Sequence, residues 1–363
     1  MMDKLQKARE TINRVDTEMA KLFEERMDAV KLVAEYKIEN GIPIDDFGRE
    51  AEIIAKNTDS ISNEDYKSYY VNFLRNNIIL SKDMQHKILE GMKVGYSGVE
   101  GAFANIAAQR IFPDAKCVPY SDFKSAYKAC ERGECDCVVL PIENSHNGDV
   151  GNVLDLAFFG SLYISGVYEA EIVQNLIGIK GSTPGDVKKV VSHPQALGQC
   201  ASYIEKHGYE TEDAVNTAVA VKDVALKADK SIAAIGSIEA AEKFGLEVLA
   251  ANINESNTNT TRFAVFSRGA RRPANSDERF IMLFTVKNAA GSLGKAISVI
   301  GQHGFNLRAL KSRPTKELVW NYFFYVEGEG NIDSWQGKAM LDELEKCCSH
   351  LKIVGTYEKE IHI

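Results

Sequence analysis

The sequence has no apolar run that approaches the roughly 18 residues from which a membrane-spanning helix is built. Its start, MMDKLQKARETINRVD, is amphipathic and lacks the apolar core of a signal peptide. With 43 Lys and Arg against 51 Asp and Glu, the net charge is −8, so the chain also lacks the basic excess that attracts nucleic acid or acidic membranes. These absences predict a cytoplasmic protein that binds neither, and that must meet any anion with locally clustered Arg and Lys.

The cysteines do not form a metal-binding pattern. Cys130, Cys135 and Cys137 have the spacing C-x4-C-x-C, which matches no standard zinc ligand set, and Cys347 and Cys348 are adjacent. Seven cysteines of this kind are typical of structural thiols in a reducing compartment.

The length of 363 residues exceeds what one ordinary core supports, and a hydrophobic content of 45% is enough for a core in each of two or three domains. We expect three: residues 1–90, 91–268 and 278–363. The basic segment RGARRPANSD, residues 268–277, is the predicted linker between the last two.

The first region, Lys4 to about Ile88, has no convincing strand pattern and no Gly or Pro except Gly41, Pro43 and Gly48. Its first helix carries heptads. The seam positions are Leu5, Ile12, Met19, Arg26 and Val33, with Ala8, Val15, Leu22, Ala29 and Tyr36 in the companion position.

Arg26 does not suit that seam. A guanidinium taken out of water without a partner costs several kcal/mol, so Arg26 must meet an anion. Lys37 lies eleven residues later and therefore on nearly the same face of the helix. The alternative is a helical hairpin whose cations reach solvent or pair with Glu.

This region resembles the all-helical type of chorismate mutase. It has a side chain of the required type at each active-site position of that family: Arg9, Arg26, Lys37, Asp46, Arg49, Glu50, Ser81 and Gln85. The resemblance implies that Arg9, Arg26 and Arg49 bind the two carboxylates of chorismate. It also implies that Lys37 and Gln85 bind the breaking ether oxygen.

In the same family, the residue equivalent to Glu50 binds the substrate hydroxyl, and those equivalent to Ser81 and Asp46 make secondary contacts. The rearrangement needs no nucleophile, only a clamped dianion and charge placed against the developing oxyanion. Arg9 is rotated by about 100° from Arg26 on one helix. The resemblance therefore implies an interlocked dimer in which Arg9 comes from the partner chain.

The second region alternates strand and helix patterns, which predicts an α/β domain with ligands at the carboxyl ends of its strands. Polar clusters stand at two predicted strand exits: Glu143-Asn144-Ser145 after CVVLPI, and Ser192-His193-Pro194-Gln195 after VKKVV. A third cluster, SNTNTTRF (256–263), leads into an apolar run. Each cluster alone is equally typical of a turn or a helix N-cap.

Together the clusters resemble prephenate dehydratase, through GVEGAFANIAA (98–108), VVLPIENSHNGDVGNVLDL (138–156), SHPQALGQC (192–200), AAIGSIEAAEKFGLEVLA (233–250) and INESNTNTTRF (253–263). The resemblance implies two lobes like type II periplasmic binding proteins, with the second lobe inserted at about residues 170–250 and the catalytic cleft between the lobes.

In that family the threonine of the TRF triplet, here Thr261, is the main catalytic residue. The other cleft residues that the resemblance implies are Glu143, Asn144, Ser192 and Gln199. Hydroxide departure needs a hydrogen-bond donor at the leaving oxygen, and neither a metal nor an organic cofactor. His193 is the alternative acid, and Arg262 is a candidate for a substrate carboxylate, although strand alternation turns it away from Thr261. Gln174 stands where many relatives carry His.

The third region reads as strand (280–286), helix (292–303), strand (307–313), strand (318–327), helix (333–348) and strand (353–359), a ferredoxin-like βαββαβ unit. It resembles an ACT domain, which implies an effector site. The residues that carry this resemblance are Gly291, Ser292, Leu293, Ser312, Arg313 and Pro314. Phenylalanine-regulated relatives usually read GAL and ESRP, whereas Ser292 and Lys311 depart from these motifs. The alternative is a dimerisation module without a ligand.

We therefore expect a cytoplasmic bifunctional enzyme that converts chorismate to prephenate and prephenate to phenylpyruvate, as a homodimer or homotetramer inhibited by L-phenylalanine. The alternatives are a dehydratase for prephenate or arogenate with an inactive mutase domain, and a non-catalytic binding protein.

Overall fold

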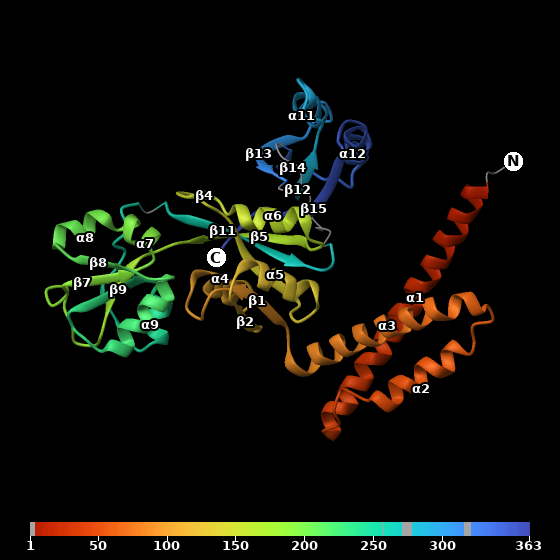
Figure 1. The fold of residues 1–363 in the computed structure, drawn as a ribbon, viewed down its shortest axis with the longest axis horizontal. Helices are drawn as coiled ribbons and strands as arrows, with labels where there is room; N and C mark the ends of the chain where they lie inside the picture. The colour runs from red at the N-terminus through yellow and green to blue at the C-terminus, as the bar shows by residue number, and fades with distance from the viewer. Residues whose placement is uncertain (1–3, 257, 271–277, 316–320) are drawn as a thin grey trace. The chain divides into compact units, whose positions relative to one another are not determined.

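The computed structural model describes residues 4–256, 258–270, 278–315 and 321–363. The chain forms two compact units, a helical one that ends at Met92 and a larger one from Lys93 to Ile363. The described parts of the helical unit are α1 (Lys4–Asn40), α2 (Phe47–Thr58) and α3 (Glu64–Glu90), as Figure 1 shows. Asp46 and Asn63 cap α2 and α3, because each side chain accepts a hydrogen bond from a backbone N–H of the first turn.

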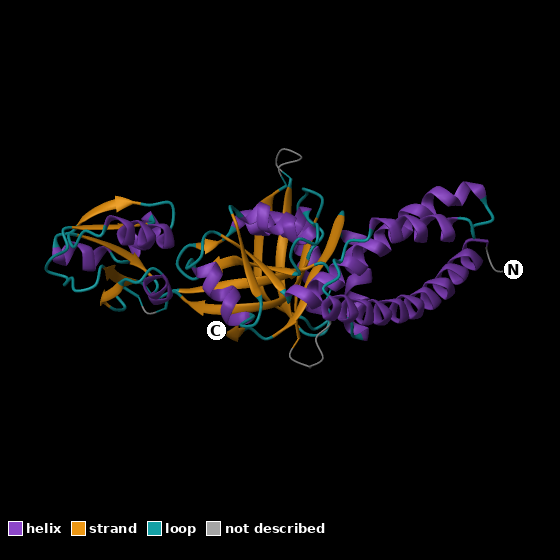
Figure 2. Cartoon of the chain, turned by 90° about the horizontal axis from the view of Figure 1, so that it is seen from below, coloured by secondary structure: helices purple, strands orange, loops and turns teal. Residues whose placement is uncertain are grey.

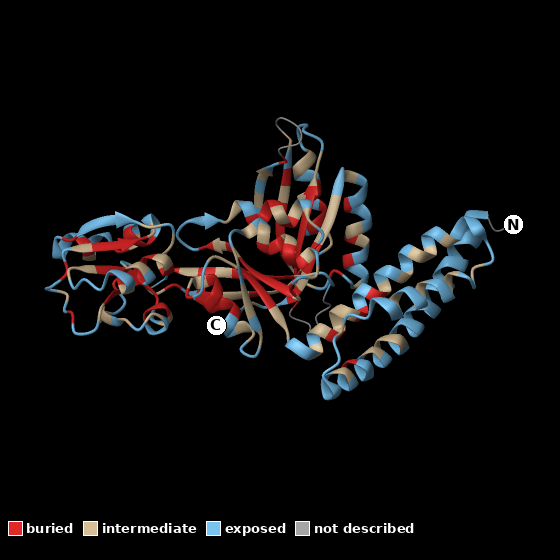
Figure 3. Cartoon of the chain, turned by 60° about the horizontal axis from the view of Figure 1, so that its bottom comes forward, coloured by how far each residue is buried: buried red, intermediate tan, exposed pale blue. Residues whose placement is uncertain are grey.

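The helical unit buries few apolar side chains. Among its described residues only Ala34 and Ile78 are buried hydrophobics. Figure 3 shows that most residues of this unit are exposed. The expected heptad seam of α1 is exposed except at Arg26, which is partly buried; Leu22 is 64% exposed and Ile12 57%. A seam of this kind needs a second apolar surface to cover it.

The larger unit contains three sheets (Figure 2). The first has the strand order β16-β5-β11-β3-β1-β2, with β4 paired to β3. Its strands and helices are β1 (Lys93–Ser97), α4 (Phe103–Ile111), β2 (Lys116–Tyr120), α5 (Phe123–Glu131), β3 (Cys137–Asn144), β4 (Gly148–Asp149), α6 (Gly151–Phe159), β5 (Tyr163–Glu171), β11 (Thr260–Ser267) and β16 (Ile361–His362).

The second sheet belongs to a lobe inserted between β5 and β11, with the strand order β10-β6-β9-β7-β8. Its elements are β6 (Asn175–Gly178), β7 (Lys189–Ser192), α7 (Pro194–Gln199), α8 (Ala201–His207), β8 (Glu210–Asp213), α9 (Thr217–Lys227), β9 (Ile232–Gly236), α10 (Ile238–Lys243) and β10 (Glu247–Ala250). The chain crosses between the lobes twice, and the crossings are hydrogen-bonded: Ile172 N donates to Asn259 O over 2.8 Å, and Ile253 N to Gln174 O over 2.9 Å.

The third sheet is antiparallel, with the ferredoxin-like order β13-β14-β12-β15. Its elements are β12 (Glu278–Thr285), α11 (Ser292–Gln302), β13 (Asn306–Pro314), β14 (Tyr322–Glu329), α12 (Trp335–Cys347) and β15 (His350–Glu358). The predicted βαββαβ order is therefore present. The start of the predicted strand 318–327 lies partly outside the described residues.

The third domain shares a core with the first lobe. Along β12, Phe280, Met282 and Phe284 pack with α11 and α12, whereas Ile281 and Leu283 belong to the same cluster as the first-lobe core. This explains why β12 is apolar at successive positions, since both of its faces are buried. After β15, the short strand β16 returns to the first sheet and pairs in parallel with β5.

Gly355 brings β15 against β5. A Cβ added at Gly355 would lie 2.1 Å from the carbonyl oxygen of Ile164, a backbone atom that no side-chain rotation can move away. We expect Gly355→Ala to lower the free energy of unfolding by roughly 1–3 kcal/mol, as overpacking does. The measurement is thermal and denaturant unfolding of the whole chain.

Gly301→Ala is the matched control, because it lies in α11 of the same domain and an added Cβ there meets nothing within 4 Å. It should be neutral, or stabilising by up to about 1 kcal/mol through helix propensity. If both variants lost the same free energy of unfolding, the close approach of β15 to β5 would be contradicted.

Candidate active sites

Arg26 reaches from α1 to α3. Its Nη1 donates to Ser81 Oγ at 2.5 Å and to the carbonyl oxygen of Asn77 at 3.2 Å. Burial lowers the pKa of Arg26. Within the described part of the chain no carboxylate pairs with this guanidinium, so the seam position holds a partly desolvated cation whose partners are neutral. That arrangement suits an anionic ligand.

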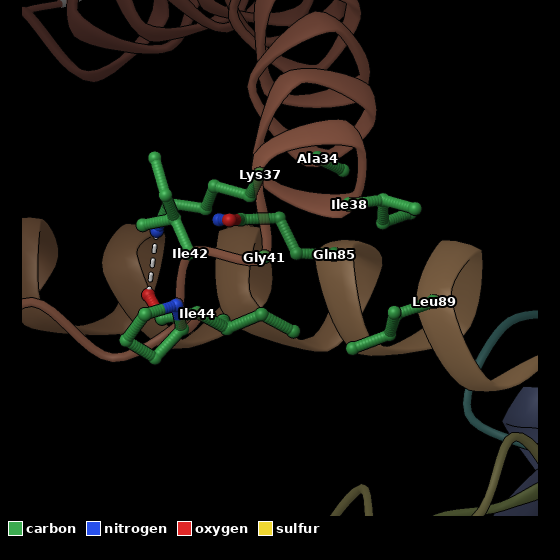
Figure 4. Close-up of a pocket in the computed structure, with 9 residues that line it drawn as sticks. Ala34, Lys37, Ile38, Gly41, Ile42, Ile44, Gln85 and Leu89 are labelled. Carbon is green, nitrogen blue, oxygen red and sulfur yellow. Dashed lines mark hydrogen bonds between the residues drawn. The ribbon is translucent and has the colours of Figure 1, made fainter.

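A pocket of about 310 Å³ lies at the junction of α1, the following turn and α3 (Figure 4). Lys37 Nζ donates to the carbonyl oxygen of Ile44 at 2.7 Å, and Gln85 Nε2 donates to that of Ser81 at 3.3 Å. Gln85 Oε1 is buried and has no hydrogen-bond partner among the described residues. Lys37 and Gln85 both line the pocket.

The other predicted mutase residues lie around this region with varied surroundings. Asp46 caps α2 by accepting from Arg49 N, while the Arg49 side chain is exposed and pairs with Glu52 at 2.7 Å. Glu50 pairs with Lys82 at 2.6 Å. Arg9 is exposed on α1. Within one chain, the fold therefore brings four of the predicted mutase residues together: Arg26, Ser81, Lys37 and Gln85. Arg9 is not among them, because it lies exposed on α1.

Lys82 was missed by the sequence reasoning. It pairs with Glu50 and also with Asp45, at 2.8 Å, and the hydrogen bonds that its ammonium donates to these two carboxylates raise its pKa. Nothing in the sequence marked it, because Lys82 follows Ser81 on a helix where exposed lysines are ordinary.

In the larger unit, Asn144 at the end of β3 faces Thr261 at the start of β11, as the antiparallel register dictates. Asn144 Nδ2 donates to Thr261 Oγ1 at 2.9 Å. Asn144 Oδ1 accepts from the backbone N–H groups of His146 and Asn147, at 3.1 and 3.0 Å. Because backbone N–H groups can only donate, they fix the orientation of the Asn144 amide.

This orientation determines what Thr261 can do. Its oxygen accepts from Asn144, so its own proton is left to be donated. A hydroxyl that already accepts a hydrogen bond is polarised and becomes a better donor. Thr261 is 8% exposed in an environment of neutral amides, which is suited to hydrogen-bonding a departing oxygen.

A cleft of about 510 Å³ runs between the two lobes. It is lined by His146, Asn147, Gln195, Gly198, Gln199, Asn254, Glu255, Ser256 and Asn259. Gln199 comes from α7 of the second lobe. Thr261 and Asn144 are not among the lining residues; Asn144 bonds Thr261 and also Asn259, which lines the cleft. Asn259, which the sequence reasoning did not single out, contacts both Asn144 and Gln199.

Ser192 does not face the cleft. It is completely buried, and its Oγ donates to the carbonyl oxygen of Ile235 at 2.7 Å, which ties β7 to β9. The cap of α7 is His193, whose Nδ1 accepts from Gln195 N. The position of Ser192 therefore corrects the expected catalytic role to a structural one. His193 caps α7.

Arg262 and Glu143 lie on the face of the sheet opposite Thr261. Arg262 is 15% exposed and bonds Glu143, Glu327 of β14 and Glu360, each at 2.9 Å. Burial alone would lower the pKa of Arg262, but the hydrogen bonds with Glu327 outweigh it and raise the pKa. The expectation that Arg262 binds substrate, and that Glu143 lines the cleft, is corrected: both side chains bind the third domain.

Two residues of the predicted effector region also face the first lobe. Lys311 Nζ pairs with Glu143 at 2.8 Å and with Asp149 at 2.5 Å. Arg313 Nε pairs with Asp155 of α6 at 2.7 Å. Gly291 has left-handed backbone geometry, φ 80°, directly before α11, and Ser292 and Leu293 form its first turn. Ser312 and Pro314 are exposed on the edge strand β13.

The fold defines two chemically distinct candidate sites, one with cations among helices and one with amides and a hydroxyl between α/β lobes. Residues 8–86 match the family model for chorismate mutase type II, and residues 94–271 match the one for prephenate dehydratase. No helix in the described ranges is both long and apolar enough to cross a membrane.

The bifunctional chorismate mutase/prephenate dehydratase of Aquifex aeolicus is 33% identical over 99% of this chain and 99% of its own length. Arogenate dehydratase 2 of Petunia hybrida is 32% identical over 78% of this chain and 76% of its own. The structure of prephenate dehydratase from Arthrobacter aurescens in complex with L-Phe matches with a TM-score of 0.69 and 25% identity, covering 74% of this chain and 90% of that one.

The chain therefore belongs to the bifunctional chorismate mutase/prephenate dehydratase family. It is an isomerase and a carbon–oxygen lyase of phenylalanine biosynthesis.

Lys311 joins the third domain to the first lobe, and its replacement tests that contact. Burial would lower the pKa of Lys311, but Asp149 and Glu143 outweigh burial and raise it. We expect Lys311→Glu, which restores the usual residue of related motifs, to lower the free energy of unfolding by roughly 3 kcal/mol, since it places a third carboxylate beside two others. Lys311→Met should lower the free energy of unfolding by less than Lys311→Glu, because it removes a charge without adding a third carboxylate. Denaturant unfolding at neutral pH measures both.

The acid limb of the stability curve gives a second readout. Burial would raise the pKa of Glu143, but Lys311 and Arg262 hold it below its ordinary 4.5. Its stabilising contribution is complete above 4.5 and is lost as the pH falls through the lower folded value. In Lys311→Met this acid loss should shrink. Lys338 is exposed on α12, so Lys338→Met should change neither the free energy of unfolding at neutral pH nor its loss in acid. If Lys311→Met and Lys338→Met had the same dependence of stability on pH, the contact between Lys311 and Glu143 would be contradicted.

Proposed function

We propose that chorismate is rearranged at the helical site of Arg26, Lys37 and Gln85, and that prephenate is dehydrated and decarboxylated at Thr261 and Asn144. The observation that carries the second assignment is the hydrogen bond from Asn144 to Thr261, whose direction is set by two backbone N–H groups. The first is supported by a partly buried arginine with no carboxylate partner in the described structure.

At the helical site the reaction is a rearrangement within one molecule, so the protein needs to hold a dianion in its reactive conformer and to stabilise charge on the ether oxygen. Arg26 supplies a cation for a carboxylate. Lys37 lies at the pocket wall, where its ammonium can turn from the Ile44 carbonyl to a ligand oxygen. An ether oxygen only accepts hydrogen bonds, so Gln85 would have to present its NH₂ group to it.

At the cleft, the ring C–O bond of prephenate breaks with its electron pair leaving on oxygen, and the oxygen takes up a proton to depart as water. The bond to the ring carboxylate breaks at the same time and releases CO₂, and its electron pair completes the aromatic ring. Thr261 donates the hydrogen bond to the departing oxygen, while Asn144 donates to Thr261 Oγ1 and makes that hydroxyl a stronger donor.

The C-terminal domain is proposed to be an ACT domain that binds L-phenylalanine. Its βαββαβ order and the glycine turn before α11 support this, as does the likeness to a dehydratase solved with L-Phe. Since Lys311 and Arg313 are engaged by the first lobe, the ligand contacts fall to the backbone around Gly291 to Leu293 and to the exposed edge of β13. Phenylalanine binding would then act on a domain that is ion-paired to Glu143.

The proposed assembly is a dimer built on the helical unit. The α1 seam is exposed while the unit buries only two apolar residues among those described, so one copy has too little core to be stable alone. Covering the seam with the α1 helix of a second copy would bury it and would bring a partner arginine, Arg9, toward the site. Pairing through other surfaces to a tetramer is compatible with this arrangement.

Arogenate is a second candidate substrate for the cleft, on the likeness to arogenate dehydratase 2. Arogenate carries an ammonium where prephenate carries a ketone, and the cleft wall includes the carboxylate of Glu255. Parallel assays with the two substrates distinguish them.

Thr261→Val keeps the shape of the side chain and removes its hydroxyl. We expect phenylpyruvate formation from prephenate to fall by about 10²–10³ in kcat, the typical cost of one transition-state donor. Prephenate formation from chorismate should remain at the wild-type rate, which shows that the helical unit is folded, and an unchanged thermal unfolding transition shows the same for the larger unit. Wild-type dehydratase activity in this variant would overturn the assignment.

Arg26→Met should have the reverse effect. We expect chorismate turnover to fall by about 10²–10³, because the lost guanidinium both binds and orients the dianion, with dehydratase activity unchanged. Arg14→Met is the control, since Arg14 lies on the same helix but is exposed and pairs with Glu18. If the two variants lost the same activity, Arg26 would have no special role.

A further inference from the structure

Asn259 lies at the point where the chain returns from the second lobe to β11. It is 1% exposed, and its carbonyl oxygen accepts from Ile172 N of the other crossing segment. Its side chain reaches both lobes: Oδ1 accepts from Asn144 Nδ2 at 2.9 Å, and Nδ2 donates to Gln199 Oε1 at 3.0 Å. One side-chain amide thus joins the catalytic strands of the first lobe to α7 of the second.

The direction of every hydrogen bond in this chain of amides is determined. The backbone N–H groups of His146 and Asn147 require the oxygen of Asn144 on their side, so the NH₂ of Asn144 faces Asn259. Asn259 must then present its oxygen to Asn144, and therefore its NH₂ to Gln199. Reversing any amide would bring two donors or two acceptors together.

The last amide ends at the cleft. Gln199 Oε1 accepts from Asn259 and also from Gln174 Nε2, at 3.3 Å. Both neighbours donate to the oxygen, so the Nε2 group of Gln199 is the end left for the cleft, which Gln199 lines. A donor there attracts the carboxylate of a substrate, whereas a carbonyl oxygen would repel it.

We propose that Asn259 is a positioning residue for the dehydratase reaction: it fixes which end of the Gln199 amide faces the substrate and joins the two lobes at the cleft. Gln174 supports it as a second donor. Gln174 is 2% exposed, and its own Oε1 has no hydrogen-bond partner among the described residues, so donation to Gln199 is the bond that its side chain makes. This inference rests on the proposed assignment of the dehydratase reaction to this cleft.

Asn259→Asp tests the proposal with almost no change of shape. The variant keeps an oxygen for Asn144 but replaces the donor to Gln199 with an acceptor. Gln199 must then rotate to give its Nε2 to Asp and present its oxygen to the cleft. We expect the KM for prephenate to rise by at least about tenfold, the cost of losing a hydrogen bond to a charged group, with a smaller change in kcat.

The decisive measurement repeats this substitution in a Gln199→Leu background, where there is no amide to reorient. Because Gln199 itself binds substrate in the proposal, Gln199→Leu alone should also raise KM. Adding Asn259→Asp to it should then raise KM by less than about threefold, since the two changes remove one shared interaction. Independent, multiplying effects would overturn the proposal, because they would mean that Asn259 acts by general stability or charge.

Gln195→Glu is the charge control. Gln195 lines the same cleft, and its substitution adds a negative charge without touching the amide chain. Gln195→Glu should change the KM for prephenate by the same factor in the wild-type and in the Gln199→Leu background. Chorismate turnover should be unchanged in every variant, and an unchanged thermal unfolding transition excludes unfolding of the larger unit. Loss of prephenate turnover in Thr261→Val shows separately that the dehydratase assignment itself holds.

Discussion

The pairing of β11 with β3 is the constraint on which the larger unit depends. In this register Thr261 lies opposite Asn144, and Arg262 lies opposite Glu143. Because successive side chains of a strand point to opposite faces, one pairing turns a hydroxyl and an amide to the face of Asn259, at the cleft wall, and an ion pair to the third domain. A shift by one residue would exchange the two faces. Reaction chemistry and domain docking are therefore fixed by the same backbone hydrogen bonds.

The docking face combines a network of ion pairs with apolar contacts along β14. Arg262 is held by three carboxylates, and Tyr325 also donates to Glu327. Around this network, Phe158 of α6 stacks on Phe323 with ring centroids 4.2 Å apart. A buried ion network contributes less to stability than to selecting one geometry, since each charge is costly unless every partner is in place. The apolar contacts supply the stabilisation and the ions specify the orientation.

The sequence predicted the helical N-terminal unit, the α/β alternation and the ferredoxin-like order, because periodicity and strand exits depend on local patterns. It also predicted that Arg26 must meet an anion, and the described structure leaves this guanidinium with neutral partners, Ser81 and the carbonyl oxygen of Asn77. The sequence prediction failed for the directions of side chains. Glu143 and Asn144 are adjacent in a strand, so their side chains point to opposite faces and cannot both face one cleft. The alternation of the strand could have shown this. Asn259 lies in the polar cluster 256–263 but received no role of its own, and Lys82 gave no signal, since the partners of both are brought to them only by the fold.

The C-terminal strand β16 has a mechanical consequence. Ile361 and His362 pair with Tyr168 and Glu169 of β5, and Ile363 N donates to the carbonyl oxygen of Glu169. The chain thus enters the third domain after one strand of the first sheet and leaves it into another strand of the same sheet. A domain that is anchored to one sheet at both of its ends, and that shares a core with it, cannot diffuse as if on a flexible tether.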